Sequence, residues 1–599
     1  MRGAIEPERR RSGGPLLVNP AILLLGGAVL ASGALLLVLG SQLTFLLDDW
    51  DFLLYRRGWT PHSLLDPHFG HLSPIPIVVY KALLATFGMD SILPFNVVST
   101  LVFLLSAVLL FVYLRRRIDD WLALISTTVI LFLGAAWEDL LWPFQIGFFG
   151  PMTCGLGMLL SLEREDRTGD RLACVLLTGS MSFSSLGLPF AAGATVDLLQ
   201  RRESWRSRIY IVAIPVGLYA LWWLGWDHTA STSSSLHNLG TTPLFVLNAL
   251  AAGIASLLGL VNSTSETVAP GGLDWGRVAL PVILLLTGWR VHRLRQVPRW
   301  FWIVVVTGLA FWILTGINTQ SARPPTASRY QYPSAIFILL AAAELLRGVR
   351  MERKALIAVS AVAAASLMGN ITLLYDSYKS RKEAAEQQRA GLGAVEIARD
   401  TVPPVFNLPV GEHGTEFYFS LPTLPRVPAP GMVSVDAGAY LKAVDDFGSP
   451  AYSPGELATS PESAREAADK VLAAVLGIRL ASTNTPASPS AGPRPSLIGP
   501  PGALAGSNAN CINLNASGAN PPLLDLPPGG AAVASGPSSE FEVRLRRFAS
   551  TSIPVDLGNL SARASAIINI PRDRSGQPWK LSLDGSGEVN VCGRPSHGQ

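Results

Sequence analysis

The stretch TFLLDDWDFLLYRR, residues 44–57, decides how the rest of the chain is interpreted. It begins as the end of a long apolar run and then places Asp48, Asp49 and Asp51 close together, with Arg56 and Arg57 directly after them. Ionisable groups at membrane depth are costly and usually have a function. The stretch therefore predicts a membrane helix that delivers a cluster of carboxylates to one membrane face.

The composition supports this interpretation. The chain has 599 residues, of which 49% are hydrophobic and 15% charged, and its mean hydropathy is +0.35. These values exclude an ordinary soluble multidomain protein and are typical of a polytopic membrane protein with a soluble part. The net charge of +4 is small, so charge is informative through its placement in the loops. We expect membrane lipids as partners and no nucleic acid.

Arginine placement predicts the topology. The tail of residues 1–16 is Arg-rich and is expected to be cytoplasmic, which sends Asp48 to the outer face of a bacterial plasma membrane. Eleven predicted spans put every Arg-rich loop inside and the C-terminus outside. They cover residues 17–47, 95–114, 121–137, 145–162, two short segments within 172–200, then 208–226, 276–290, 300–317, 334–347 and 354–375.

One apolar segment, 244–260, does not fit this topology as a span, because it would move the basic residues 290–299 to the outer side. We interpret it as re-entrant or interfacial. The predicted transmembrane domain therefore covers residues 17–376.

The remainder of the chain is predicted to lie outside the membrane. Residues 377–400 are expected to form a helical connector, and residues 401–599 an extracytoplasmic α+β domain. Within it, 482–507 has the composition of a flexible linker, and 508–599 is expected to form a small β-sandwich. Cys511 and Cys592 lie in this polar region and predict a disulfide, which agrees with an oxidising compartment.

The first outer loop combines Asp48, Asp49 and Asp51 with His68 and His71. A carboxylate partly desolvated by neighbouring helices can take a proton from a hydroxyl, which predicts a general base. Alternatively, Asp48 and Asp49 with His71 would hold a divalent cation, Mg or Mn. The H-x-x-H spacing fits no strong zinc signature. Charges that simply sit in water and headgroups are the structural alternative.

The second outer loop, AAWEDLLWPFQIGFFGP, pairs acids with aromatic residues. Its candidate residues are Trp137, Glu138, Asp139, Trp142 and Gln145. Tryptophans at the interface are routine, and tryptophans that stack on a sugar ring would look the same. Because two outer loops each combine carboxylates with Trp, we expect them to serve one shared site.

The late outer loop, residues 318–335, carries Arg323, Arg329 and Tyr330 with no acid nearby in sequence. The planar fork of Arg suits a phosphate group. A membrane-anchoring role, in which the side chain reaches for the interface, is the structural alternative.

Together these features resemble the GT-C glycosyltransferases: a long first helix ending in Asp-Asp, an outer loop with His, a short paired-helix region and a late Arg-Tyr loop. More specifically, residues 17–376 look like the bacterial protein-mannosyltransferase and aminoarabinose-transferase type. The resemblance implies transfer of a sugar from a polyprenyl-phosphate carrier to an acceptor at the outer face. It implies a general base at Asp49 or Asp48, with Asp49 favoured.

The resemblance also implies assistance from Glu138 or Asp139, and a grip on the carrier phosphate by Arg329 or Arg323. Some relatives carry a basic residue in the middle short-helix region, and SFSSLGLPF here has none. The outer domain is similar to carbohydrate-binding modules attached to some cell-wall members. The expected partners are the polyprenyl-phosphate donor and a glycan or other envelope acceptor. Two other classes remain: a lipid-linked-sugar flippase or transporter, and a non-catalytic glycan-binding scaffold.

Overall fold

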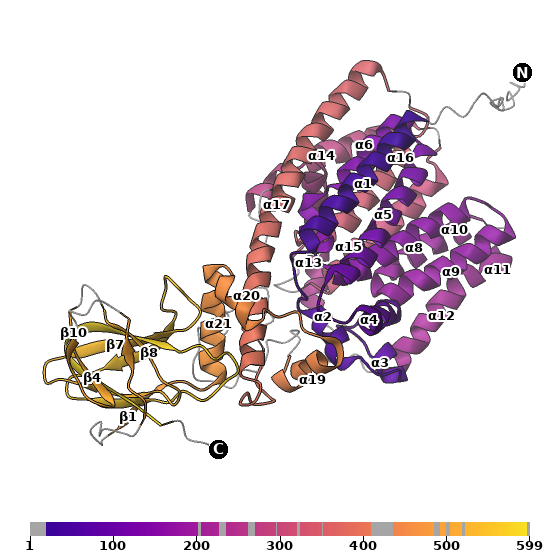
Figure 1. The fold of residues 1–599 in the computed structure, drawn as a ribbon. Helices are drawn as coiled ribbons and strands as arrows, with labels where there is room; N and C mark the ends of the chain where they lie inside the picture. The colour runs from indigo at the N-terminus through magenta and orange to yellow at the C-terminus, as the bar shows by residue number, and fades with distance from the viewer. Residues whose placement is uncertain are drawn as a thin grey trace, which may run out of the picture. The chain divides into compact units, whose positions relative to one another are not determined.

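The computed structural model describes eleven stretches of the chain: 19–201, 205–226, 235–261, 270–294, 296–319, 324–349, 351–408, 435–483, 492–498, 504–517 and 521–595. The chain forms two compact units (Figure 1). The first, here called the helical unit, comprises Met1–Val38 and Val98–Asp376. The second, here called the mixed unit, comprises Leu39–Val97 and Ser377–Gln599.

The helical unit is built from apolar helices joined by short turns. They are α1 (Pro20–Gly40), α5 (Leu93–Arg115), α6 (Asp120–Leu131), η2 (Gly134–Ala136), α7 (Trp137–Leu141), η3 (Pro143–Gln145), α8 (Ile146–Leu162), α9 (Arg167–Phe183), η4 (Ser185–Gly187), α10 (Leu188–Gln200), α11 (Trp205–Arg208), α12 (Tyr210–Gly225), α13 (Leu236–Leu257), α14 (Pro270–Arg293), α15 (Arg299–Ile317), η5 (Ser328–Tyr330), α16 (Gln331–Leu345) and α17 (Arg353–Ile397). The unit boundaries fall inside α1, α5 and α17.

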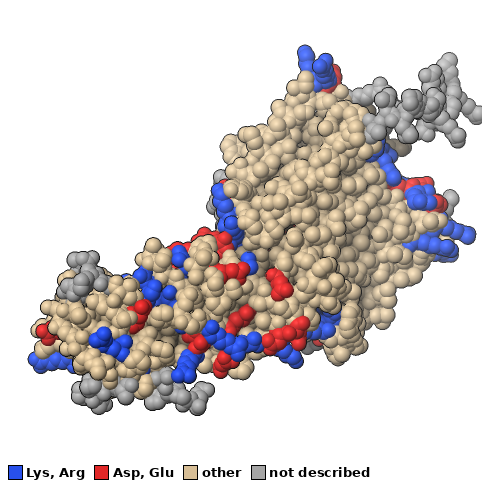
Figure 2. Space-filling view, in the orientation of Figure 1, with Lys and Arg blue, Asp and Glu red and all other residues tan. Residues whose placement is uncertain are grey.

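Seven stretches of the described chain are long and apolar enough to cross a membrane. They are Pro20–Gly40, Leu93–Arg115, Asp120–Leu141, Pro143–Leu162, Leu236–Leu257, Arg299–Ile317 and Arg353–Ile397. Large apolar side chains such as Leu30, Leu224 and Leu285 point outward from the helices. Figure 2 shows a broad face of the helical unit with few charged residues, as expected of a surface solvated by lipid. The protein is therefore an integral membrane protein with several helical spans.

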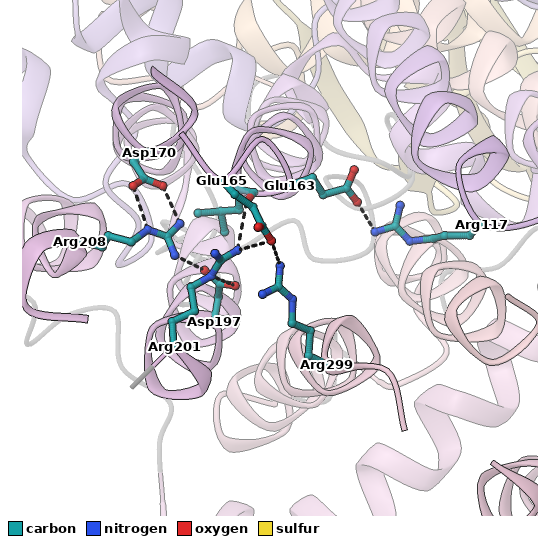
Figure 3. Close-up of polar contacts among 9 residues, drawn as sticks. Arg117, Glu163, Glu165, Asp170, Asp197, Arg201, Arg208 and Arg299 are labelled. Atoms are coloured by element: carbon teal, nitrogen blue, oxygen red, sulfur yellow. Dashed lines mark hydrogen bonds and ion pairs between the residues drawn. The ribbon is translucent and has the colours of Figure 1, made fainter. Parts of the chain in front are cut away.

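Ion pairs collect the Arg-rich ends of these helices at one end of the unit. Arg117, after α5, pairs with Glu163, after α8, and with Glu344 in α16. Glu165 pairs with Arg201, after α10, and with Arg299 at the start of α15 (Figure 3). We call this the arginine end. Because it gathers loops that are far apart in sequence, it supports the predicted placement of the Arg-rich loops on one side.

The opposite end of α16 belongs to a second set of contacts, here called the acid end. Ser328 Oγ donates to the carbonyl of Ala135 at 2.8 Å. Asn370, in α17, accepts from the Ala135 amide and donates to the Ser256 carbonyl. These hydrogen bonds join η2, η5, α13 and α17, and they place the second outer loop and the late outer loop side by side.

The segment 172–200, predicted as two short spans, lies in two helices with a turn between them, and their crossing of the membrane stays a prediction. Helices α9 and α10 are separated by η4, which Ser184 caps by accepting from the Leu186 amide. Gly187 lies so close to the backbone of Met181 that a Cβ would sit 2.5 Å from its nitrogen. Only a glycine fits this tight reversal.

Helix α13 contains the apolar segment that does not fit the predicted spans. Asn238, near its start, donates to the carbonyls of Ile317 and Thr319 at 3.1 and 3.0 Å. Ser256, near its end, donates a hydrogen bond from Oγ to Gln331 Oε1 at 3.2 Å. Ile317 ends α15 and Gln331 begins α16, so both ends of α13 contact the acid end. Because α13 is also long and apolar enough to span, its interfacial placement stays a prediction.

The mixed unit combines short helices with an antiparallel sheet. Its helices are α2 (Asp48–Trp50), η1 (Asp51–Tyr55), α3 (Pro61–Leu65), α4 (Pro74–Phe87), α19 (Ala437–Phe447), α20 (Pro454–Thr459) and α21 (Glu462–Val475). Its strands are β1 (Leu480–Thr483), β2 (Ser496–Leu497), β3 (Leu504–Ser507), β4 (Cys511–Ala516), β5 (Leu523–Asp525), β6 (Ala531–Ser535), β7 (Glu540–Arg546), β8 (Val555–Leu560), β9 (Ser565–Ile568) and β10 (Lys580–Gly593).

Strand β10 organises the sheet. Its first half pairs with β5 and β7, and its second half pairs with β4 and β6. Gly587, with φ of 113°, lies where the strand changes partners. Cys592 is directly opposite Cys511 in the ladder and forms the predicted disulfide with it. The linker prediction was wrong in part, because β1, β2 and β3 include residues of 482–507.

Candidate active site

The chain turns sharply where the first apolar helix gives way to the carboxylates. Leu47 has a φ of 41°, a conformation that a branched side chain rarely adopts. Helix α2 begins directly after it, and a single π-helical turn, η1, follows. Strained residues and π turns are frequent at functional sites. This local geometry separates the side chains of Asp48, Asp49 and Asp51 into different surroundings.

Asp49 is held inside the mixed unit. It is 0% exposed, and its Oδ1 accepts from the Tyr80 hydroxyl at 2.5 Å. Its Oδ2 accepts from the Leu46 amide at 2.8 Å. Tyr80 lies in α4 and packs edge-on against Phe52, which belongs to η1. Asp49 therefore ties the turn after the apolar helix to α4.

His68 joins the other two carboxylates. Its Nδ1 lies 2.9 Å from Asp51 Oδ2, and its Nε2 lies 3.7 Å from Asp48 Oδ2. Arg56 Nε also pairs with Asp51 Oδ2 at 2.8 Å. The Asp48 side chain keeps 25% of its surface exposed, so it is the acid of this group that a substrate hydroxyl can reach most readily.

The charges in this cluster reinforce one another. Burial opposes the charged form of His68, but hydrogen bonds and the charges of Asp48 and Asp51 outweigh it and raise the pKa of the imidazole. For Asp51, burial alone would raise the pKa, yet His68 and Arg56 together lower it. The cluster is therefore favoured as an imidazolium held between carboxylates.

His71 is placed by the backbone. His68 and His71 exchange two backbone hydrogen bonds, of 3.0 and 2.9 Å, across a turn made by Phe69 and Gly70. Both turn residues have positive φ, as a two-residue turn of this type requires. The described part of the chain contains no group of three or more His, Cys, Asp or Glu side chains placed to hold a metal ion. A divalent cation held by Asp48, Asp49 and His71 stays a prediction.

A second cluster lies at the acid end of the helical unit. Arg329 Nε lies 3.1 Å from Glu138 Oε1, which joins the late outer loop to the second outer loop. Ser328 Oγ accepts from the Glu138 amide at 3.1 Å. The Arg329 guanidinium thus has the Glu138 carboxylate as its neighbour, although no acid lies near Arg329 in the sequence.

Asp139 stands apart from this network. It is 1% exposed, and neither carboxylate oxygen accepts a hydrogen bond from any residue that the structure describes. A buried carboxylate normally has donors around it, because leaving it without them costs several kcal/mol. The position next to the Glu138–Arg329 pair therefore has the properties of a site that awaits a ligand.

The other residues predicted for these loops are distributed as follows. Trp137, Trp142, Gln145 and Tyr330 are all buried, and Trp142 stacks on Phe144 with ring centres 5.5 Å apart. Stacking of either tryptophan on a sugar stays a prediction. Arg323 lies outside the described residues. Sequence reasoning did not assign Tyr80 or Ser328 to the site, because only the fold brings them to the acids.

No protein-family model matches the chain, and no curated protein matches it. Among solved structures, it is similar to the crystal structure of ArnT from Cupriavidus metallidurans bound to undecaprenyl phosphate. The match has a TM-score of 0.43 and 12% identity, and it covers 67% of this chain and 85% of that chain.

Proposed function

We propose that this protein transfers a sugar from a polyprenyl-phosphate-linked donor to a cell-envelope glycan, lipid or protein at the outer face of the plasma membrane. The observation that carries the proposal is Asp139, a buried carboxylate with no hydrogen-bond donor among the described residues, next to the Glu138–Arg329 ion pair. An ionisable group retained at such a cost within a membrane-spanning stretch is usually functional.

Arg329 supports binding of the donor phosphate. Its side chain is 23% exposed, so a phosphate group can reach the guanidinium. Arg binds phosphate through two parallel hydrogen bonds, and Glu138 holds the guanidinium in place for that contact. Sugar hydroxyls would then supply the donors that Asp139 lacks. Arg323 stays a second candidate for the phosphate.

Asp48 is the general base in this proposal. Asp49 and Asp48 were both candidates, and the exposure of Asp48 supports assigning it this role. The buried Asp49, bound by Tyr80 and the Leu46 amide, would position the turn instead. His68 and Asp51 fix the carboxylate of Asp48 and keep a positive charge beside it.

The proposed reaction is a single displacement at the anomeric carbon of the sugar. The acceptor hydroxyl attacks the anomeric carbon, and its proton passes to a general-base carboxylate. The bond between the anomeric carbon and the phosphate oxygen breaks, and the polyprenyl phosphate leaves with the electron pair. Arg329 stabilises the charge on the leaving phosphate. No step is assigned to a cation, and Mg²⁺ or Mn²⁺ enters only as a condition of the assay.

A transfer assay tests the proposal. Purified protein in nanodiscs would be incubated with a panel of radiolabelled polyprenyl-phosphate sugars, with Mg²⁺, with Mn²⁺ and with a chelator. We expect turnover or slow hydrolysis of one donor, abolished in Asp139→Asn and in Arg329→Gln. Asp436→Asn, at the half-buried N-cap of α19 in the mixed unit, serves as the acid control. Donor binding without turnover in every protein would favour the flippase or the scaffold and overturn the proposal.

A further inference from the structure

A pocket at the arginine end is not used by the proposed reaction. It has a volume of about 440 Å³, within the ~300–1,000 Å³ of small-molecule sites. Its lining includes Arg116, Arg117, Glu163, Arg299, Trp300 and Arg347. Helix α16 separates it from the acid end, since the helix begins at Gln331 and ends shortly before Arg347.

The pocket holds more guanidinium groups than carboxylates. Arg116 uses Nη1 on Glu163 at 2.7 Å, and Arg117 pairs with the other oxygen of the same acid. Arg299 uses Nη2 on Glu165, as Figure 3 shows. Arg347 makes no hydrogen bond or ion pair with any residue in the described stretches. Two acids thus face four arginines, and this surplus of N–H donors suits an anion.

The place of the pocket in the fold points to the source of that anion. Two stretches long enough to span a membrane end directly beside it, at Arg115 and Leu162, and a third begins at Arg299. The centre of the Trp300 ring lies 5.5 Å from the guanidinium carbon of Arg299 and 5.7 Å from that of Arg117. Tryptophan and arginine at span ends mark the level of lipid headgroups. Basic pockets between helices at this level bind anionic headgroups.

The geometry points to a binding site for the phosphate group of an anionic phospholipid, and we propose that Arg116, Arg299 and Arg347 hold it. Arg117 and Glu163 form the floor, because their side chains are only 1% and 15% exposed. The bound lipid links the ends of α5, α8, α15 and α16. This proposal is independent of the proposed reaction, which uses the opposite end of the helical unit.

The test measures lipid binding by the full chain in detergent. Phosphatidylglycerol is titrated against wild type, and the rise in melting temperature gives an apparent dissociation constant. The test variant combines Arg116→Gln with Arg347→Gln, since both side chains are exposed and their loss leaves the buried Arg117–Glu344 pair intact. The control is Arg171→Gln, an exposed arginine on α9 outside the pocket. Phosphatidylcholine and inorganic phosphate are the ligand controls.

We expect phosphatidylglycerol to stabilise wild type and Arg171→Gln equally, and the double variant to bind at least about tenfold more weakly. An equal response in all three proteins would overturn the proposal, because the effect would then come from the bulk lipid. Stabilisation of wild type by inorganic phosphate to the same extent would also overturn the lipid assignment and leave a site for free phosphate.

Discussion

His68 Nδ1 lies 2.9 Å from Asp51 Oδ2, while its Nε2 lies 3.7 Å from Asp48 Oδ2. One imidazole therefore spans the two more exposed carboxylates of the opening stretch, and the third, Asp49, turns away to Tyr80. The three carboxylates of the opening stretch therefore lie in different surroundings, with Asp48 partly exposed and Asp49 buried.

The first prediction concerns catalysis by Asp48. Replacing a general base removes about 10²–10⁴-fold of rate, so Asp48→Asn should lower transfer by that factor while the melting temperature changes little. Asp66→Asn is the matched control, because Asp66 lies in the same loop and its carboxylate pairs with the exposed His62. The measurement is the initial rate with the donor identified in the panel. Full activity in Asp48→Asn, with activity lost in a folded Asp49→Asn, would transfer the role to Asp49.

The second prediction follows from the raised pKa of His68. A group whose pKa is higher in the folded state contributes stability that is complete below its unfolded pKa, about 6.5, and is lost as pH rises through the folded value. His68→Gln should therefore destabilise most at pH 5–6 and least at alkaline pH. Melting temperatures of wild type and variant across this range give the test. A difference that stays constant with pH would mean that His68 is neutral in the folded protein.

The third prediction concerns Tyr80 and Asp49. Tyr80→Phe removes the hydroxyl that donates to a fully buried carboxylate, which should cost about 1.5–3 kcal/mol. Asp49→Asn should weaken the same hydrogen bond, so the double variant should be less destabilised than the sum of the two. Thermal unfolding of the four proteins measures this coupling. Additive effects would indicate that the hydroxyl and the carboxylate act separately.

Local sequence patterns predicted the features that depend on residues close together in the chain. The apolar runs, the Arg-rich turns, the short helix pair in 172–200 and the cysteine pair all follow from hydrophobic length, charge placement and compartment. The contacts that define the site do not. Nothing in the sequence near Arg329 indicates Glu138, and nothing near Tyr80 indicates Asp49, because each pair is brought together only by packing between distant helices. For the same reason, the sequence does not indicate that Asp49 is buried while its neighbour Asp48 is partly exposed.

The fourth prediction concerns the disulfide between Cys511 and Cys592. It closes a loop with a sequence separation of 81 residues, and a cross-link of this length stabilises by about 4 kcal/mol in the loop-entropy model. The double variant Cys511→Ser, Cys592→Ser should therefore unfold its sheet at lower denaturant. Cys154→Ser is the control, because Cys154 is free and lies in α8 of the helical unit. Limited proteolysis of the strands would report the loss, and equal protection in both variants would contradict it.

The fifth prediction contrasts two buried acids of the helical unit. Asp139 has no hydrogen-bond donor among the described residues, so Asp139→Asn removes an acid whose ionised form is not stabilised and should raise the melting temperature while it abolishes transfer. Glu344 is equally buried but pairs with Arg117 and accepts from the Tyr113 hydroxyl at 2.7 Å. Glu344→Gln leaves a buried guanidinium without its full charge partner, a change that costs about 3–5 kcal/mol. Opposite shifts in melting temperature would separate an acid kept for function from an acid kept for structure. If Asp139→Asn instead destabilised the protein as Glu344→Gln does, Asp139 would have a structural partner and the assignment of this site would fail.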